Sequence, residues 1–165
     1  MAKAKYQFED FLTTVSDGYK EFVTTVHKML LQDNYRPQIK VTKSNGLQLA
    51  YYQPKIKVVA GVILIFLFCN DKLMIRIYGK NHKEYPDVLN SLPERIVNQI
   101  DKAGDCVKFI NPQRCWNGCI GFDFHIREKR YQKCYVQCFQ LDVDLESMPY
   151  LIELIKSENK ERMAV

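Results

Sequence analysis

The sequence predicts an α+β fold, in which a mainly antiparallel sheet of about six strands is packed by N-terminal, middle and C-terminal helices. Two observations lead to this prediction. Residues 58–69 are apolar at nearly every position, which is typical of a strand buried on both faces. Apolar residues at helical spacing occur at 7–32 before that strand, and at 82–103 and 147–160 after it. Because no repeat or linker interrupts the 165 residues, we expect one domain.

A first hairpin is predicted directly after the N-terminal helix. Residues 38–44 and 47–53 are extended segments joined by Asn45-Gly46, and this dipeptide between such segments is a strong hairpin signal. A two-residue turn at the dipeptide places Ile39 opposite Tyr52. Together with the hairpin that follows, these segments make an antiparallel meander of four strands.

The central hairpin runs from Val58 to Tyr78 and turns at Asn70-Asp71, two residues that tolerate the left-handed conformation. Arg76 carries a charge in its second strand, on the same face as Tyr78. An arginine above a sheet can bind an anion or a carboxylate, so Arg76, Tyr78 and Trp116 are candidate ligand-binding residues. The simpler interpretation of Arg76 is a strand-end side chain that reaches water over its apolar stem.

A C-terminal hairpin completes the predicted sheet, with strands at 119–127 and 130–143 and a turn at Glu128-Lys129. In this register Asp123 lies opposite Cys134. One face is apolar and belongs to the core; it carries Ile120, Phe122, Phe124, Ile126, Tyr131, Tyr135, Phe139 and Leu141. The opposite face is polar and rich in cysteine; it carries Cys119, Asp123, His125, Arg130, Cys134 and Cys138.

The cysteines of this region raise the hypothesis of a zinc site. Two Cys-x3-Cys pairs resemble a four-cysteine ligand set, but residues four apart on a strand are about 13 Å apart, so Cys134 and Cys138 cannot both reach one ion without a bulge. Cys119 lies opposite Cys138 in the predicted register, and with Cys115 these two would form a three-cysteine site. The simpler alternative is free, partly buried thiols without a cofactor, because ribbon-type zinc sites use Cys-x2-Cys spacing.

The same polar face raises an enzymatic alternative. Cys134, His125 and Asp123 are the residue types of a nucleophile, a base and a group that orients the base. Nothing in the sequence specifies an oxyanion hole, so a solvated sheet face is the simpler explanation. We therefore expect a protein that is not an enzyme, and we keep this triad as the alternative.

Composition narrows the class of partner. The chain is 47% hydrophobic and 26% charged, as expected for a globular protein, and its net charge of +5 is mixed along the sequence. That charge permits nucleic acid without indicating it, since no basic stripe stands out. The apolar run 58–69 would span about 18 Å as a helix, less than a bilayer of about 30 Å. The N-terminus shows no signal region, so we expect a cytoplasmic protein without structural disulfides.

Several stretches resemble a group of proteins from clostridial-type bacteria to which no function is assigned. The resemblance rests on Thr42 to Tyr52, Ile75 to Tyr78, Leu92-Pro93 and the spacing of Cys115, Cys119 and Lys133-Cys134. The order of a helix followed by a meander is also similar, in topology alone, to small bacterial domains described as frataxin-like iron chaperones. The chain lacks the acidic first helix and edge strand that frataxins use for iron, so the resemblance implies no site residue here.

The sequence therefore predicts a cytoplasmic, non-enzymatic α+β domain that binds a small molecule or a protein beside its sheet. A structural zinc ion at Cys115, Cys119 and Cys138 is an added hypothesis. The alternatives are an enzyme that uses Cys134, His125 and Asp123, and a protein associated with nucleic acid.

Overall fold

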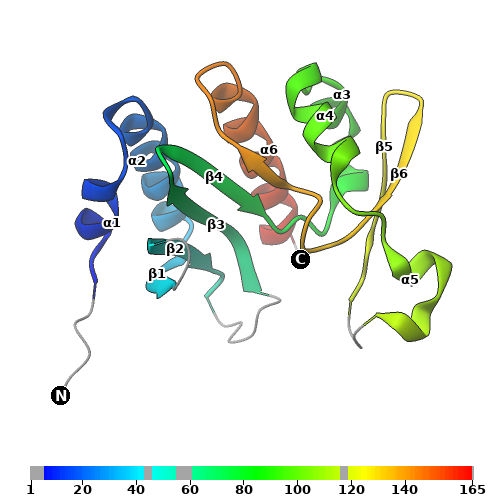
Figure 1. The fold of residues 1–165 in the computed structure, drawn as a ribbon, viewed down its shortest axis with the longest axis horizontal. Coiled ribbons are helices and arrows are strands. Elements are labelled where there is room, and N and C mark those ends of the chain that lie inside the picture. The colour runs from blue at the N-terminus through cyan, green and yellow to red at the C-terminus, as the bar shows by residue number, and fades with distance from the viewer. Residues whose placement is uncertain (1–5, 43–45, 55–60, 116–118, 165) are drawn as a thin grey trace. The chain divides into compact units, whose positions relative to one another are not determined.

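The computed structural model describes residues 6–42, 46–54, 61–115 and 119–164 (Figure 1). Its contacts divide the chain into two compact units. The first unit consists of Met1–Arg76 and Asp142–Met148, and the second of Ile77–Leu141 and Pro149–Val165. The expectation of one domain therefore stays a prediction.

The predicted α+β class is confirmed in the described part of the chain. The helices are α1 (Phe8–Thr14), α2 (Asp17–Gln32), α3 (Pro86–Asn90), α4 (Glu94–Lys102), α5 (Val107–Ile110) and α6 (Met148–Met163), with short 3-10 turns η2 (His82–Glu84) and η3 (Pro112–Arg114). The strands are β1 (Arg36–Thr42), β2 (Gly46–Tyr52), β3 (Val62–Cys69), β4 (Lys72–Ile77), β5 (Phe122–Ile126), β6 (Lys129–Lys133) and β7 (Gln140–Asp142). Five strands form one sheet in the order β1-β2-β3-β4-β7, and β5 pairs with β6 in a separate two-stranded sheet. None of the described helices has the length and apolar character needed to cross a lipid bilayer.

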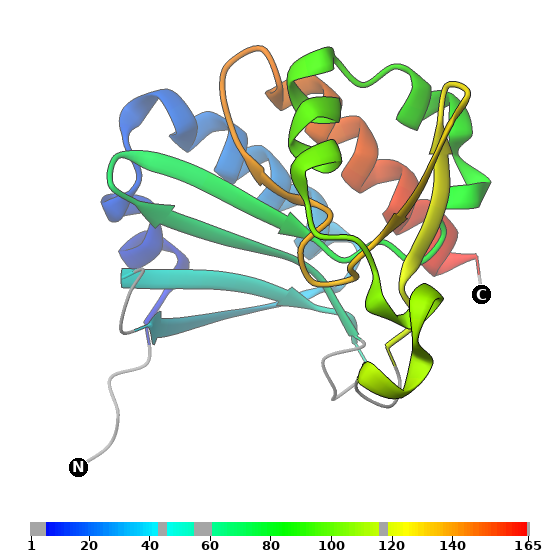
Figure 2. The ribbon, with the colours of Figure 1, turned by 45° about the vertical axis from the view of Figure 1, so that its right-hand side comes forward.

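The first unit packs its two helices on one face of strands β1 to β3 (Figures 1 and 2). Phe11 of α1 and Phe22 of α2 both contact the ring of Phe66 in β3, with ring centroids 6.5 and 5.9 Å away. Residues Val62–Leu67 of β3 are all buried, as the continuous apolar run predicts for a strand covered on both faces. Residues 58–60 of the predicted hairpin lie outside the described residues.

Of the two turns predicted in the meander, one is confirmed and the other is wrong. Asn70 and Asp71 have φ values of 51° and 59°, so the predicted left-handed turn between β3 and β4 is confirmed. The predicted register of the first hairpin is wrong, because Ile39 pairs with Leu49. Gly46 is itself the first residue of β2, with a φ of 65°, and is not half of a two-residue turn. Asn45, the other half of the expected turn, lies outside the described residues.

The C-terminal hairpin of the second unit turns one residue earlier than predicted, which shifts the pairing of its strands by two residues. Ile126 pairs with Lys129, so the loop is Arg127-Glu128, and Arg127 has a φ of 55°. The predicted turn at Glu128-Lys129 is therefore wrong. Since the pairing shifts by an even number of residues, the side chains of β5 and β6 keep their predicted faces. Ile120, which was predicted on the core face, lies before β5 and is exposed. The buried apolar side chains of the pair are Phe122, Phe124, Ile126 and Tyr131, as expected for the core face.

The predicted long strand 130–143 is wrong, because β6 ends at Lys133. The chain then pairs with the segment after α4: Asp105 forms a bridge with Lys133, and the Cys134 N–H donates to the Gly104 carbonyl over 2.9 Å. A turn follows, and β7 begins at Gln140 as part of the other sheet. The predicted pairing of Cys119 with Cys138 across the hairpin therefore does not form.

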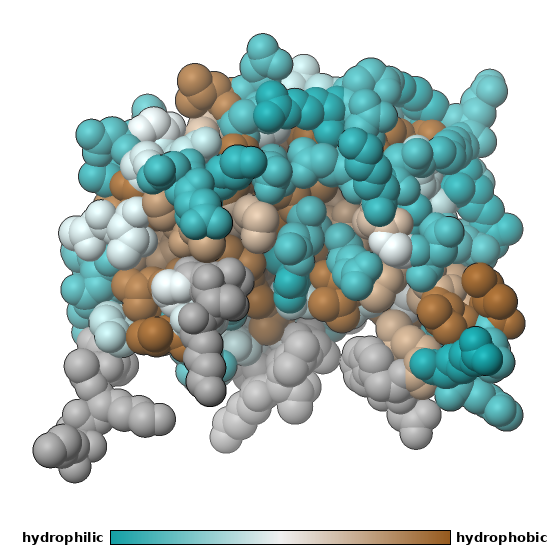
Figure 3. All heavy atoms as spheres, in the orientation of Figure 1, coloured by the Kyte–Doolittle hydropathy of each residue, from teal (hydrophilic) through white to brown (hydrophobic). Residues whose placement is uncertain are grey.

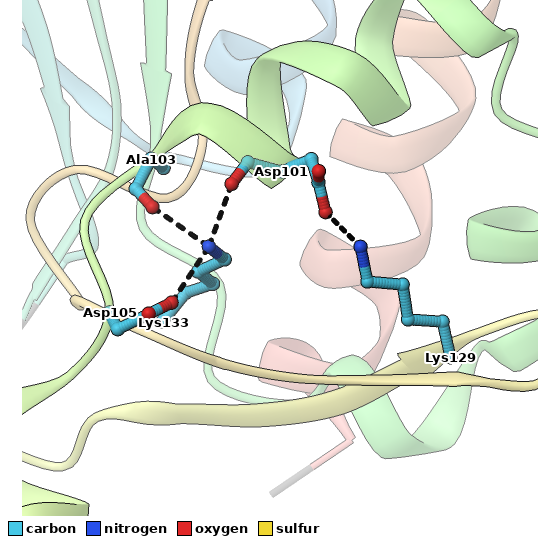
Figure 4. A network of polar contacts seen from close by, with 5 residues as sticks. All are labelled: Asp101, Ala103, Asp105, Lys129 and Lys133. Atoms are coloured by element: carbon cyan, nitrogen blue, oxygen red, sulfur yellow. Dashed lines mark hydrogen bonds and ion pairs between the residues drawn. The ribbon is translucent and has the colours of Figure 1, made fainter.

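Lys133 fixes the hairpin to the end of α4 (Figure 4). Its side chain is buried, and its ammonium donates to the Asp101 carbonyl at 2.9 Å, the Ala103 carbonyl at 2.8 Å and the Asp105 carboxylate at 2.8 Å. Each of the three N–H groups of the ammonium thus has an acceptor. Its positive charge also lies at the C-terminus of α4, where the helix dipole favours a cation. Lys129 adds an exposed ion pair with Asp101. This attachment orients the polar face of β5–β6.

Candidate functional site

Two neighbouring pockets in the second unit share His82, Lys83 and Asp123. The lysine pocket, of about 400 Å³, also has Lys80, Phe109 and Ile120 among its lining residues. The hairpin pocket, of about 440 Å³, also has Phe124, His125 and Arg130 among its lining residues. Both volumes fall in the range of small-molecule sites, about 300–1,000 Å³. The predicted polar face of the hairpin therefore does border hollows in the surface.

Asp123 is held by its neighbours across the hairpin. Arg130 donates through Nε to Oδ1 over 2.9 Å and through Nη2 to Oδ2 over 2.6 Å, and the Gln132 side chain donates over 3.4 Å. The hydrogen bond from Arg130 is the main reason that the pKa of Asp123 falls to about 2. Asp123 is therefore a carboxylate at neutral pH, with its lone pairs directed to Arg130 and Gln132.

The predicted catalytic arrangement relied on a register that the structure does not have. Asp123 pairs with Gln132, so the prediction that it faces Cys134 is wrong. His125 is exposed on the same strand and pairs with Arg130. Cys134 lies beyond the end of β6, where its backbone bonds to the segment after α4. The structure thus keeps Asp123 and His125 on one face and places Cys134 outside their strand pair.

His82 lies between the pockets, inside a cage of aromatic rings. Its ring stacks on Phe139 at 4.8 Å and meets Phe122 at 4.4 Å and Phe124 at 5.3 Å. It also rests on Gly79, where an added Cβ would overlap the imidazole. Burial lowers the pKa of His82 to about 4, so the ring is neutral at pH 7. The sequence shows only an isolated histidine, because the cage comes from segments far apart along the chain.

A buried ion pair on α6 fixes the segment that carries Lys80 and Lys83. Glu158 is fully buried and accepts from the backbone N–H groups of Lys80 at 2.9 Å and Asn81 at 3.2 Å, and from the Tyr85 hydroxyl at 2.7 Å. Arg162 donates through Nε to Glu158 over 2.8 Å and through Nη2 to the Tyr78 carbonyl. The sequence prediction ended this helix at residue 160, but α6 reaches Met163 and Arg162 is buried.

The cysteines do not assemble as predicted. Cys119 and Cys138 are buried and Cys115 is half-buried. Over the ranges that the structure describes, no group of three or more His, Cys, Asp or Glu side chains is placed to hold a metal ion. The three-cysteine zinc site therefore finds no support in this structure. Burial also raises the pKa of the Cys138 thiol, which makes this side chain a poor nucleophile.

Of the predicted ligand-binding residues, Tyr78 and Arg76 lie in the described part of the chain, and neither lines the two pockets. Tyr78 is buried in the second unit, and its ring contacts Tyr135 at a centroid distance of 5.6 Å, so it packs as a core residue. Arg76 is half-buried in β4 and belongs to the first unit. Trp116 lies outside the described residues. Asp123 and His125, which were predicted as part of a catalytic triad, do line the hairpin pocket.

A larger hollow of about 600 Å³ lies between α4 and the tip of the hairpin. Two ion pairs cross its walls, Arg127 with Glu94 and Lys129 with Asp101. Both of its cations are thus already paired, and its fifth charged residue, Glu128, is an acid, so an anion would have to displace an ion pair to bind there. The lysine and hairpin pockets are therefore the better candidates for a binding site.

Comparison of the chain with protein-family models, curated proteins and solved structures finds no match. The resemblances to clostridial-type proteins and to frataxin-like domains stay predictions, and function is inferred from the site itself.

Proposed function

We propose that the second unit is a non-enzymatic binding module that takes a small anionic ligand at the lysine and hairpin pockets. The observation that carries this proposal is the position of Lys83, which lines both pockets beside a carboxylate already paired with Arg130. Lys80 adds a second ammonium to the lysine pocket, whose other described acid is Glu84. An incoming anion would thus meet two ammonium groups at one entrance.

The surroundings of Lys80 strengthen its attraction for an anion. The pKa of Lys80 is lowered, first by burial and then by the nearby charge of Arg162. A partly desolvated ammonium next to another cation gains more from an arriving anion than an ammonium in water does. Glu158 holds the backbone N–H groups of Lys80 and Asn81, so this part of the site is already in place before the ligand arrives.

Two titratable groups of the site, Asp123 and His82, support binding over catalysis. Asp123 has its carboxylate bound by Arg130, and His82 is confined in an aromatic cage with a lowered pKa. A general base needs a free lone pair within reach of a substrate, and these two side chains already have structural roles. The cytoplasmic location and the binding of a small molecule rather than a protein are part of the same proposal.

A titration with acetate tests the proposal. We expect the backbone amide NMR signals of residues around Lys83 and Asp123 to shift on addition of acetate, and the shifts to disappear in Lys83→Glu. The matched control is Lys40→Glu, which changes an exposed lysine on β1 of the first unit and should leave the shifts intact. Shifts that persist in Lys83→Glu, or that appear elsewhere in the wild-type protein, would contradict the proposed site.

A further inference from the structure

We propose that the lysine pocket selects anions that carry a flat apolar group, such as aromatic carboxylates, over small anions such as acetate that lack one. This inference rests on the proposed function and names the ligand class of the same site. It is drawn from the walls of the pocket, where Phe109 and Ile120 stand beside Lys80 and Lys83. A ligand that is charged at one end and apolar at the other would satisfy both kinds of side chain.

The apolar wall of the pocket belongs to an exposed hydrophobic patch on α5 and the start of the hairpin. Phe109 is 40% exposed and Ile120 is 48% exposed, and they are joined by Val107 at 45% and Ile110 at 81%. Figure 3 shows hydrophobic side chains gathered over α5, at the lower right. Large apolar side chains grouped in this way mark ligand-binding or interaction surfaces more often than scattered ones do. Phe109 and Ile120 are the two members of the patch that line the lysine pocket.

Phe109 is held in place although its ring is partly exposed. Gly121 has a φ of 63°, and a Cβ at this position would lie 2.8 Å from Cε2 of Phe109 and 2.9 Å from Sγ of Cys106. The phenyl ring therefore rests against the backbone at a distance that only glycine permits. Lys108, the residue before Phe109, donates to the Cys119 carbonyl and ties α5 to the chain next to Ile120.

The remaining side of the pocket offers aromatic surface that is already buried and fixed. His82 and Phe122 both line it, and their rings meet at 4.4 Å with an interplanar angle of 67°. Because the pKa of His82 is lowered, the imidazole is neutral and presents a ring rather than a charge at pH 7. Rigid aromatic walls cost little conformational entropy when a flat ligand binds. A small anion without an apolar group would leave the exposed side chains of Phe109 and Ile120 in contact with water.

Three probe molecules separate the charge of the ligand from its apolar part. Naphthoate carries both features, acetate carries only the charge, and naphthylmethanol carries only the ring. We expect naphthoate to bind at least about tenfold more tightly than either of the others, measured by calorimetry and amide NMR shifts. Phe109→Ala should weaken naphthoate binding about tenfold and leave acetate binding unchanged. Ile110→Ala, which alters the neighbouring and more exposed member of the patch, is the matched control and should change neither.

The outcomes distinguish this inference from the proposed function. If acetate and naphthoate bind equally at Lys83, the anion site stands and selection for an apolar group is overturned. If naphthoate binds equally well to the wild-type protein and to Phe109→Ala, the apolar wall has no role and the inference is also overturned. If neither anion shifts the signals around Lys83, both the inference and the proposed function fail.

Discussion

Replacing Glu158 with glutamine should destabilise the second unit severely, although the two side chains have nearly the same shape. Oε1 of Glu158 accepts from the Lys80 N–H at 2.9 Å and from Nε of Arg162 at 2.8 Å. Oε2 accepts from the Tyr85 hydroxyl at 2.7 Å and from the Asn81 N–H at 3.2 Å. Glutamine keeps one acceptor oxygen and puts a donor NH2 group in place of the other. An NH2 group that faces Lys80 and Arg162 loses both of their hydrogen bonds. An NH2 group on the other side loses the bond from Asn81, whereas the Tyr85 hydroxyl can turn and accept from it.

The size of the expected loss in the free energy of unfolding follows from the burial of Glu158. Glu158 is 0% exposed, and a buried donor left without its acceptor costs about 1–3 kcal/mol. Arg162 also loses its counter-charge while it stays buried, and breaking a buried ion pair from one side costs about 3–5 kcal/mol. These two costs overlap, since they share the same contacts. We therefore expect a loss of about 3–5 kcal/mol in the free energy of unfolding.

Urea unfolding followed by far-ultraviolet circular dichroism measures this loss. The matched control is Glu153→Gln, the same change at an exposed position of α6, which should stay within about 0.5 kcal/mol of the wild-type protein. A Glu158→Gln variant that loses less than about 1 kcal/mol, or no more than the control, would refute the buried network as the anchor of the Lys80–Glu84 segment.

Two further predictions concern the same unit. The pKa of His82 is about 4 in the folded protein and 6.5 when unfolded, so its stabilising effect is complete above pH 6.5 and is lost as the pH falls to about 4. That loss amounts to about 3 kcal/mol in the free energy of unfolding. Urea unfolding between pH 6.5 and 4 should show that the free energy of unfolding depends less on pH in His82→Phe than in the wild-type protein. An unchanged pH dependence would contradict burial of His82 as the cause of its lowered pKa. Lys133→Met should lower the free energy of unfolding by about 2–4 kcal/mol, because three acceptors lose a charged donor, whereas the exposed Lys129→Met should cost less than about 1 kcal/mol. Equal losses in the two lysine variants would argue against the capping role of Lys133.

Local signals predicted the parts of the fold that depend on neighbouring residues. The Asn70-Asp71 turn was predictable because both residues tolerate the positive φ that the turn requires. The core face of β5–β6 was predictable because alternation survives a register error of two residues. The position of that turn was not, because it depends on Arg127 adopting a positive φ, which its residue type does not indicate.

The rest of the site depends on contacts between distant segments. β6 ends at Lys133 because the acceptors for its ammonium lie at residues 101 to 105, and no local pattern records this. The cysteine site was expected from a strand that ends before Cys134 and Cys138 are reached. Asp123 and His125 were predicted on one face for catalysis, and that face instead borders the hairpin pocket. The walls supplied by His82 and Phe109 come from segments with no shared sequence pattern.

The most direct test of the central claim is the position of a bound probe. Nuclear Overhauser contacts between the ring protons of naphthoate and the side chains of the protein report which residues surround the ligand. We predict contacts from the naphthoate ring to Phe109, Ile120 and His82, with the carboxylate of the ligand toward Lys83. Contacts confined to the hollow between α4 and the hairpin tip, to the first unit, or to no defined set of residues would contradict it.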